Sequence, residues 1–597
     1  MSRVKWLLEK AAVENEPGLT NAQMMLTNND LRPGKITLAN RFFGSYFAIA
    51  LPLSFSLRFV QRLTDGICLA VDPERRQWRW LNFIAFWIAD SLNINTWMIS
   101  SSMIVDGLSW WQSWICVWVG YFVAACFVCL TGRIGAVYHI SFPVTARASF
   151  GIWGSFWPVL NRVVMAVIWY GVQSYIGGQC VTVMIEAIWP SYRNLHNGLS
   201  ASAGVDTKNF VSFFLFWLLS LPALWFPVHK VRHLFTVKAI YSPIAAIAFF
   251  AWAISRANGL GPIIDQPNTV HGSDLSWAMV KGIMSCIGNF AALIMNDPDF
   301  SRFARTPKDA LWSQLFTIPV GFGITSFIGI IASSSSSVIF NDGYTWNPLD
   351  LLAKFLDGAS SGQRFGIFII ATGFALAQLG TNISANSISA GTDLTALLPK
   401  YLTIRRGSYI CAIVGLAMCP WNLLSTSNNF TTYLSAYSLF LSAIAGVMIC
   451  DYYIVRKGYL NIHSLYSASK SDCYHYTFGF SWRAYTAYIC GIMINIVGFA
   501  GAVGCKVPIG AQYIYNINYF TGVIVSGVVY LILTRLFPVP ETSATWNEVD
   551  IDTEDFSLAY GKDPNDLEGH GSADRRSFDE VVPETDRKGL SSTDQKV

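Results

Sequence analysis

Charged side chains are scarce in this sequence. Only 13% of its 597 residues are Asp, Glu, Lys or Arg, whereas 53% are hydrophobic and 15% are aromatic. A soluble domain of ordinary composition carries about 25% charged residues. This deficit excludes a soluble globular protein, and the formal net charge of +4 is too small to indicate a nucleic-acid partner. The chain is therefore predicted to be an all-α protein embedded in a lipid bilayer.

Patterns that would indicate disulfides, metals or catalysis are also lacking. The twelve cysteines are scattered, several of them within apolar runs, and they form no disulfide framework. Cys126 and Cys129 have a metal-like spacing, but no other ligand cluster accompanies them, so no metal site is expected. The apolar runs contain no His-rich cluster and no nucleophile motif, which argues against an enzyme and gives no reason to expect a cofactor. Residues 1–33 are polar, so no cleavable signal peptide is expected and the first spanning helix should itself direct insertion.

Twelve stretches are apolar enough, over about 20 residues each, to be predicted as transmembrane helices. They lie at residues 81–103, 109–131, 157–187, 209–228, 234–254, 278–296, 311–333, 365–388, 407–425, 429–450, 482–503 and 517–536. Basic residues cluster after the even-numbered stretches. They are Lys230, Arg232, His233, Lys238, Arg302, Arg305, Lys308, Lys400, Arg405, Arg406, Arg456 and Lys457, with Arg133 and Arg147 between the second and third stretches. The opposite loops are poorer in Lys and Arg, so the positive-inside rule places both termini in the cytosol.

The regions outside these stretches divide the chain into three parts. Residues 1–79 are predicted to be a cytosolic N-terminal tail, residues 80–537 a twelve-helix domain, and residues 538–597 an acidic, disordered cytosolic tail. Ser, Thr and Lys residues in the tails are expected targets for regulation, for example by the ubiquitin and endocytic machinery. The segment 34–71 contains an apolar core, but Pro52 and Arg58 interrupt it. It is predicted not to span the membrane, because a thirteenth span would invert every later loop.

Polar residues interrupt two of the predicted spans. The first span carries five polar residues at mid-length, and the sixth contains Gly288-Asn289 near its middle. The five residues of the first span are Asp90, Ser91, Asn93, Asn95 and Thr96. Interrupted helices at corresponding positions of two halves are typical of transporter binding sites. The first and sixth positions correspond if two five-helix repeats are followed by two appended helices. The alternative is two ordinary helices that tolerate polar residues.

Amides and an indole in the third and eighth spans add a candidate binding site. Trp169 and Gln173 are four residues apart and share one face of a helix, as do Asn382 and Asn386. Carboxamides both donate and accept hydrogen bonds, which suits the edge of a flat, polar ring. A charged substrate would require a buried counter-ion, and Lys281 is the one basic residue near the middle of the first, sixth or eighth span. The alternative is that Gln173 bonds a neighbouring helix and Trp169 only packs.

Several long motifs carry a resemblance to a known family. Residues 161–178, 379–395 and 132–144, together with Asn-Asp-Pro-Asp-Phe-Ser-Arg-Phe at 296–303 and Asp-Tyr-Tyr at 451–453, occur in the order found there. They resemble the fungal uracil/allantoin permease branch of the nucleobase-cation-symport-1 family over residues 72–537. The resemblance implies a five-plus-five inverted repeat of the LeuT-like kind with two appended helices. It also implies alternating access and proton-coupled uptake of uracil, allantoin or uric acid at the plasma membrane.

The resemblance also implies roles for individual residues. Trp169 stacks on the substrate ring, while Gln173 and Asn386 bind its polar edge. Asn382, Asn93, Asn95, Asn289 and Phe290 are further candidates for the pocket. In sodium-coupled relatives the cation lies between the first and eighth helices, near Ala89, Asp90 and Thr381 here. Charged residues within spans are candidates for proton coupling, which adds Glu186 and Lys281.

Alternatives remain at this stage for the function and for one segment. Uridine, thiamine and nicotinamide riboside carriers are relatives too, and a channel or a non-transporting nutrient receptor would share many of these features. The insert at 34–70 departs from the family pattern, since relatives run almost directly from a Leu-x-Pro sequence into Pro-Glu-x-Arg-x-Trp-x-Trp. Gly34-Lys35 can be encoded by GGUAAG, which contains an intron-like GUAAG. We hypothesise that residues 34–70 are translated intron, which sequencing of the mature transcript would test.

Overall fold

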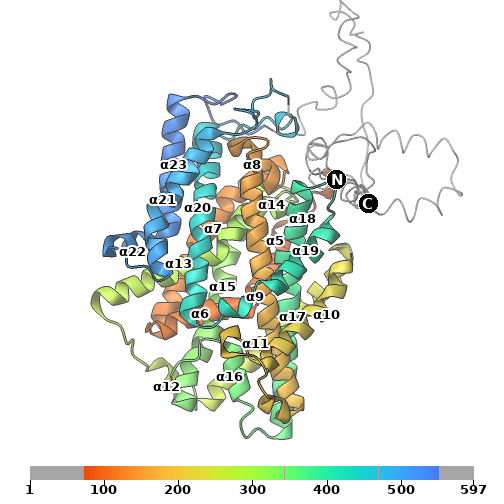
Figure 1. Cartoon of the computed structure of the whole chain (residues 1–597), viewed down its shortest axis with the longest axis vertical. Coiled ribbons are helices and arrows are strands. Elements are labelled where there is room, and N and C mark those ends of the chain that lie inside the picture. The colour runs from red at the N-terminus through yellow and green to blue at the C-terminus, as the bar shows by residue number, and fades with distance from the viewer. Residues whose placement is uncertain (1–70, 72, 227, 342, 468, 550–597) are drawn as a thin grey trace, which may run out of the picture. The chain divides into compact units, whose positions relative to one another are not determined.

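The computed structural model describes residues 71–549 except positions 72, 227, 342 and 468. The N-terminal tail up to residue 70, which contains the insert, and the acidic tail from residue 550 lie outside the described residues, so the predictions about them stay predictions. The described residues belong to one compact unit. Its named elements are all helices (Figure 1).

Each of the twelve predicted spans corresponds to helical structure. The spans are, in order, α5 (Trp80–Ser91) with α6 (Ile94–Val105), α7 (Trp110–Tyr138), α9 (Phe156–Ile188), α10 (Thr207–Trp225), α11 (Val228–Arg256), α13 (Gly272–Asn296), α15 (Pro307–Phe340), α17 (Ser361–Thr381) with η4 (Asn382–Ser387) and α18 (Ile388–Leu397), α19 (Ile404–Ala417), α20 (Ser427–Cys450) with η6 (Asp451–Val455), α21 (Trp482–Ala502) and α23 (Asn518–Leu536). Nine of these described spans are long and apolar enough to cross a membrane by themselves. The other three are the broken first span, α9, and α19, which has 14 residues.

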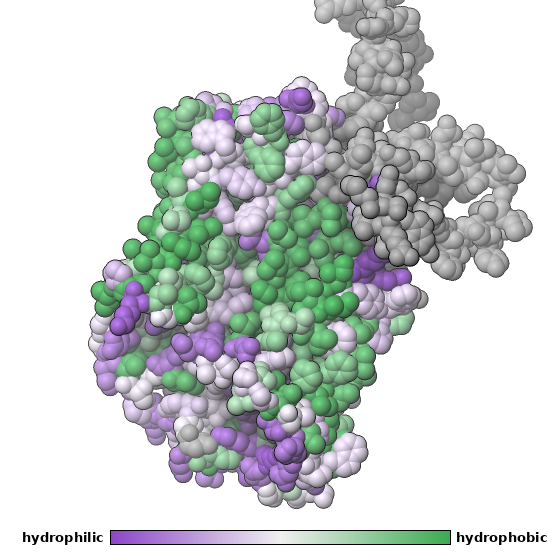
Figure 2. All heavy atoms as spheres, in the orientation of Figure 1, coloured by the Kyte–Doolittle hydropathy of each residue, from purple (hydrophilic) through white to green (hydrophobic). Residues whose placement is uncertain are grey.

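Short helices mark the two ends of the bundle. The helices α8 (Phe142–Phe150) and α14 (Pro298–Ser301) lie at one end, and α12 (Gly261–Ile264) and α16 (Pro348–Lys354) lie at the other (Figure 1). The end with α8 and α14 also carries the loop that follows η6. We call it the basic end, because Arg302 and Arg305 follow α14 and Arg456 and Lys457 follow η6. On the face drawn in Figure 2, hydrophobic side chains cover much of the helices and hydrophilic ones gather toward the end with α12 and α16. This distribution is expected of a protein whose middle section faces the hydrocarbon core of a bilayer.

The helices pack in three contiguous groups. In the first group, α5, α6 and α7 pack against α15, and α13 packs against α7. In the second, α10, α17, α18 and α19 pack against α9, and in the third, α20, α21 and α23 pack together. Small residues permit close approach between helices in a membrane. At Gly415 of α19, for example, an added Cβ would lie 2.8 Å from the Tyr170 ring of α9.

The first span is broken where the sequence predicted it. The helix α5 ends at Ser91 and α6 begins at Ile94. Asn93 stabilises this break, because its Oδ1 accepts a hydrogen bond from the Thr96 amide at 3.0 Å and its Nδ2 donates to the Asp90 carbonyl at 2.7 Å. An Asn side chain at this position satisfies backbone groups that the break leaves without helical partners.

The predicted interruption of the sixth span is wrong. The helix α13 runs without a break from Gly272 to Asn296. Gly288 instead permits close packing on α20, where an added Cβ would lie 3.2 Å from the Leu434 carbonyl oxygen. The Gly288 carbonyl also accepts a hydrogen bond from the Tyr437 hydroxyl at 2.7 Å. The glycine and its neighbouring Asn289 therefore serve helix contact and cavity lining rather than unwinding.

A second irregular helix lies in the eighth span. Residues Asn382–Ser387 form a π-helical turn between α17 and α18. The Nδ2 of Asn382 donates to the Tyr170 carbonyl at 3.2 Å and to Ser174 Oγ at 2.9 Å, which ties this turn to α9. Such π-turns inside α-helices are frequent at functional sites. The sequence did not predict this turn.

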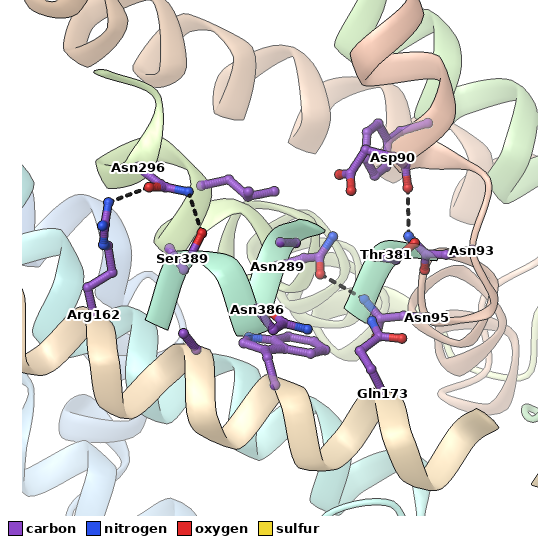
Figure 3. Close-up of a pocket in the computed structure, with 16 residues that line it drawn as sticks. Asp90, Asn93, Asn95, Arg162, Gln173, Asn289, Asn296, Thr381, Asn386 and Ser389 are labelled. Atoms are coloured by element: carbon purple, nitrogen blue, oxygen red, sulfur yellow. Dashed lines mark hydrogen bonds between the residues drawn. The ribbon is translucent and has the colours of Figure 1, made fainter. Parts of the chain in front are cut away.

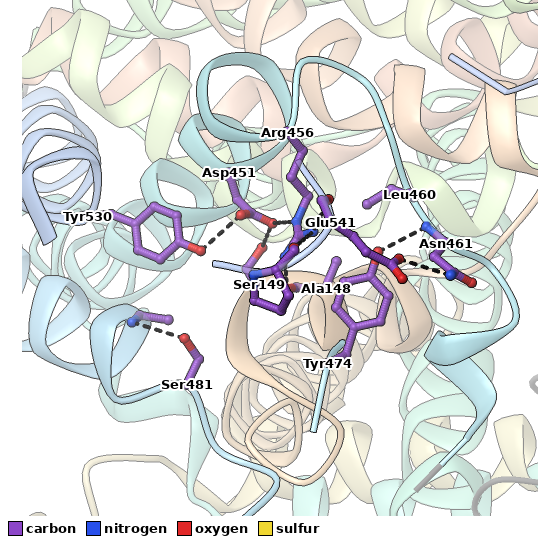
Figure 4. Close-up of polar contacts among 12 residues, drawn as sticks. Ala148, Ser149, Asp451, Arg456, Leu460, Asn461, Tyr474, Ser481, Tyr530 and Glu541 are labelled. Carbon is purple, nitrogen blue, oxygen red and sulfur yellow. Dashed lines mark hydrogen bonds and ion pairs between the residues drawn. The ribbon is translucent and has the colours of Figure 1, made fainter. Parts of the chain in front are cut away.

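A second polar region, called here the Arg456 cluster, lies at the basic end and comprises Ser149, Asp451, Arg456, Tyr476 and Tyr530 (Figure 4). Arg456 is fully buried, and its Nε lies 3.0 Å from Asp451 Oδ2. Asp451 also accepts hydrogen bonds from Tyr530 at 2.8 Å and Ser149 at 3.2 Å. The cluster thus joins η6 to α8 and α23.

Candidate functional site

One cavity, of about 650 Å³ including the space at its mouth, contains most of the residues singled out in the sequence (Figure 3). Its lining comes from the broken first span, α9, α13, one side chain of α15, and the eighth span, where the end of α17, the π-turn and α18 all contribute. The lining residues are Asp90, Asn93, Asn95, Arg162, Ala166, Trp169, Gln173, Asn289, Ala292, Leu293, Asn296, Phe322, Thr381, Ala385, Asn386 and Ser389. The structure therefore brings together eight of the predicted site residues.

Trp169 and Gln173 form the α9 side of this cavity. Trp169 is 7% exposed, and its ring centroid lies 5.7 Å from that of Tyr433 on α20. One turn further along α9, Gln173 is buried and its Oε1 has no hydrogen-bond partner among the described residues. A buried amide without a partner costs about 1–3 kcal/mol. An N–H donor bound beside the indole would remove this cost.

A pair of amides lines another side. The Nδ2 of Asn95 on α6 donates to Oδ1 of Asn289 on α13 at 3.0 Å, so the two helices share one hydrogen bond at the cavity. The Oδ1 of Asn95 is a second buried acceptor for which the described part of the chain supplies no donor. The site therefore presents two unsatisfied amide oxygens, Gln173 Oε1 and Asn95 Oδ1, and favours a ligand with several N–H groups.

Asn386 is oriented by a relay rather than by the helix alone. Its Nδ2 donates to Asn382 Oδ1 at 3.0 Å, and Asn382 in turn is fixed by Tyr170 and Ser174 of α9. The bond to Asn382 uses one N–H of the Asn386 amide, which leaves its carbonyl oxygen and its second N–H for a ligand. Asn382 itself is not among the lining residues, because its amide is turned toward α9. In the structure Asn382 therefore lies behind the cavity lining, where its amide bonds α9 and Asn386.

A buried lysine lies beside the predicted cation site. Lys238 of α11 is 4% exposed, and its Nζ lies 2.6 Å from Thr381 Oγ1. Thr381 and Asp90 both line the cavity, so this ammonium group lies beside it. The sequence reasoning counted Lys238 among the basic loop residues and missed it here. The signal was available, since Lys238 falls within the predicted fifth span at 234–254.

An ion-pair network closes the opposite end of the cavity. Arg162 of α9 is buried and forms a two-pronged ion pair with Asp393 of α18. Its Nη1 also bonds Asp299 Oδ2 of α14 at 2.6 Å and the Asn296 side chain of α13. Sequence reasoning missed these residues. A positive charge inside a predicted span must find a partner, and Asp299 and Asp393 stand in the family-like motifs, so a pairing could have been sought.

Besides Asn382, three predicted residues lie away from the cavity. Phe290 is fully buried behind it and stacks on Trp87 at 5.5 Å between ring centroids. Lys281 has an exposed side chain, and because α13 is continuous its Cα lies about 12 Å from that of Asn289 along the helix axis. Glu186 is buried near the end of α9 and is paired with Lys208 at 2.9 Å. Of the coupling candidates, Asp90 and Thr381 are the ones at the cavity.

The described residues contain no group of three or more His, Cys, Asp or Glu side chains that could hold a metal ion. Cys126 and Cys129 are free thiols. The groups that meet in the cavity are amides, hydroxyls, aromatic rings, the Asp90 carboxyl group and an arginine that is paired with carboxylates. Chemically, this arrangement can bind a polar, uncharged solute through hydrogen bonds and stacking.

Comparisons with known proteins agree with this geometry. Residues 70–522 match the family model described as permease for cytosine/purines, uracil, thiamine, allantoin. Three permeases of Saccharomyces cerevisiae are similar: those for allantoin (48% identity, 80% of this chain and 76% of the relative), uracil (48%, 79% and 75%) and uridine (46%, 81% and 78%). A solved inward-facing structure of Mhp1 superposes with a TM-score of 0.62 at 20% identity, over 80% of this chain and 96% of that chain. The fold is therefore the five-plus-five inverted repeat with two appended helices.

Proposed function

Because the chain belongs to the nucleobase-cation-symport-1 family of permeases, we propose that it imports a neutral nucleobase or ureide, of the uracil, allantoin or uric acid class, together with protons across the plasma membrane. The observation that carries the proposal is the unpaired Oε1 of Gln173 one helical turn from the indole of Trp169. From the positive-inside rule we also propose that the basic end and both termini face the cytosol. Regulation of the tails by the ubiquitin and endocytic machinery stays a prediction.

The substrate ring stacks on Trp169 and donates N–H groups to Gln173 and Asn386. Stacking contributes about 0.5–1.5 kcal/mol beyond the burial of area, and each neutral hydrogen bond contributes about 1 kcal/mol net. A neutral substrate is favoured over an anionic one because Arg162, the basic side chain among the lining residues, already has two carboxylates within bonding distance.

Uptake measurements in cells that lack their own permeases test this proposal. Radiolabelled uracil, allantoin and uric acid are offered at micromolar concentration, with unlabelled analogues as competitors. We expect saturable uptake and competition by rings with free N–H groups, and weaker competition by their N-methylated analogues. Binding without flux would instead indicate a receptor, and non-saturable flux would indicate a channel.

For the coupling ion we propose that Asp90 takes up and releases the proton, with Lys238 as its fixed counter-charge. The Lys238 ammonium group, 2.6 Å from Thr381 Oγ1, lies where sodium-coupled relatives are expected to hold their cation. A resident positive charge there disfavours a second cation by repulsion. Protonation of Asp90 from the outside changes the net charge beside the cavity by one unit, and its release to the cytosol completes the cycle.

Substitution of Asp90 separates coupling from binding. We expect Asp90→Asn to bind the substrate but to lose accumulation driven by a pH gradient, while substrate exchange persists. Lys238→Met should reduce accumulation as well, and Lys238→Arg should retain part of it. Full pH-driven accumulation by Asp90→Asn would refute this assignment of the proton site.

Alternating access requires the basic end of the cavity to open and close. We propose that Arg162 holds it closed, because this residue of α9 bridges Asp393 of α18 to Asp299 of α14. Opening would break the pair with Asp299, while the pair with Asp393 remains within one group of helices. Asp299→Asn should therefore increase the accessibility of an introduced cysteine at Ser389 from the cytosolic side. Unchanged labelling of that cysteine would argue against this role.

A further inference from the structure

The cavity is longer than the ring site that the proposed function needs. Along α9, Arg162 lies seven residues before Trp169, which corresponds to about 10 Å of helix. Both residues line the same cavity. In Figure 3, Arg162, Asn296 and Ser389 lie together at one end, and Gln173 and Asn95 lie at the other. A ring held at Trp169 by Gln173 leaves the space at the Arg162 end unfilled.

Three helical segments build this end in the same way. Ala166 precedes Trp169 by three residues and follows Arg162 by four. The matching pairs, each four residues apart, are Ala292 with Asn296 on α13, and Ala385 of η4 with Ser389 of α18. Residues four apart share one helix face. Each segment therefore contributes an alanine next to the ring site and a polar side chain one turn further, which together form what we call the Arg162 lobe.

The polar end of the lobe can donate hydrogen bonds, and its arginine already has carboxylate partners. Asn296 Nδ2 donates to Ser389 Oγ at 3.3 Å, so the Ser389 hydroxyl proton is left to donate elsewhere. Arg162 is committed to Asp299, Asp393 and Asn296. An anionic group would meet carboxylates there, and a purely apolar group would leave the Ser389 hydroxyl donor unpaired. The chemistry fits an uncharged group that accepts hydrogen bonds.

We propose that the Arg162 lobe is a subsite for a polar, uncharged arm on the substrate ring, with the three alanines providing the room and Ser389 the hydrogen bond. This inference rests on the proposed function, because it assumes a ring stacked at Trp169. Two sources supply such an arm. One is the ureido group of allantoin, whose ring is hydantoin, and the other is the ribose of uridine, whose ring is uracil.

The test compares each armed ligand with its own bare ring. Inhibition constants of uracil, uridine, hydantoin and allantoin are measured against uptake of the best labelled substrate. The variants Ala166→Val, Ala385→Val and Ser389→Ala alter the lobe, and Ala375→Val on α17, which does not line the cavity, is the matched control. Surface amounts are measured for every variant by fluorescence of a fused tag.

We expect the wild type to bind at least one armed ligand as tightly as its bare ring. Each valine variant should weaken that ligand about tenfold by overpacking the lobe, and Ser389→Ala should weaken it about fivefold by removing a donor. The bare ring should change less than twofold, as should all ligands in Ala375→Val. Discrimination between the ureido and ribose pairs identifies the arm.

Three results would overturn the proposal. Rejection of both armed ligands by the wild type would show that the lobe admits no arm. Equal weakening of armed and bare ligands, or a loss of maximal rate with unchanged inhibition constants, would show that the lobe is only an exit passage. If the wild type neither binds nor transports any ring, the proposed function itself fails, which differs from failure of the subsite alone.

Discussion

The cavity and the Arg456 cluster are both buried and polar, but they treat their polar groups in opposite ways. Around Arg456, each guanidinium nitrogen has an acceptor: Asp451 for Nε, the Pro540 and Glu541 carbonyls for Nη1, and Tyr476 with Ala148 for Nη2. In the cavity, Gln173 Oε1 and Asn95 Oδ1 have no donor among the described residues.

This difference distinguishes groups that stabilise the fold from groups reserved for a ligand. Buried polar groups are almost always hydrogen-bonded in folded proteins, so unpaired ones call for an explanation. At the cavity, the explanation that we propose is a bound solute. Full pairing in the Arg456 cluster indicates a structural joint between η6, α8 and the segment after α23. The predictions below test whether loss of folding and loss of transport separate along this line.

The largest effect is expected from Arg456→Met. Removing one member of a buried ion pair leaves the other charge unpaired and costs about 3–5 kcal/mol. We expect little folded protein at the cell surface, measured by fluorescence-detected size exclusion and surface labelling. Arg483→Met is the control, because Arg483 bonds only the backbone carbonyls of Phe537 and Pro538 at the surface. Normal folding of Arg456→Met would show that the cluster is not a structural joint.

The next largest effect is expected from Gln173→Ala. Because the lost hydrogen bond concerns the substrate and not the fold, uptake should fall about 10–100-fold while the amount of folded protein stays unchanged. Gln378→Ala is the matched control, since this buried glutamine on α17 also lacks partners among the described residues but does not line the cavity. Equal loss of uptake in both variants would remove the distinction between a ligand-binding amide and any buried amide.

How far the sequence predicted these regions depends on how local their signals are. The twelve spans and the break at Asn93 follow from apolar length and from a residue that bonds its own backbone, and both were predicted. The continuity of α13 was not predicted, because Gly288 is needed for packing on Leu434, which lies far away in sequence. Arg162 and Lys238 were missed at the cavity for the same reason. Their partners, Asp393 and Thr381, come from the eighth span.

A smaller effect is expected from Trp169→Phe. Phenylalanine keeps a ring for stacking but offers less area, so the loss should be a few-fold in KM, with maximal uptake rate little changed. Trp169→Ala should cost more, because it removes stacking and exposes the pocket to Tyr433. Kinetics of uptake at several substrate concentrations measure both. A larger loss from Trp169→Phe than from Gln173→Ala would place specificity in the ring stack and not in the amide.

The smallest effect is expected from Asn382→Ala, which lies between the two kinds of region. Asn382 is fully bonded, like the residues of the Arg456 cluster, yet it orients the cavity residue Asn386 through a 3.0 Å bond. Its loss should raise KM about threefold, by letting the Asn386 amide rotate. It should also reduce the difference in affinity between competing rings. Thr392→Ala is the control, because Thr392 bonds only the Ile388 carbonyl of its own helix. A change in surface amount with an unchanged ring preference would assign Asn382 to the fold and not to the positioning of the site.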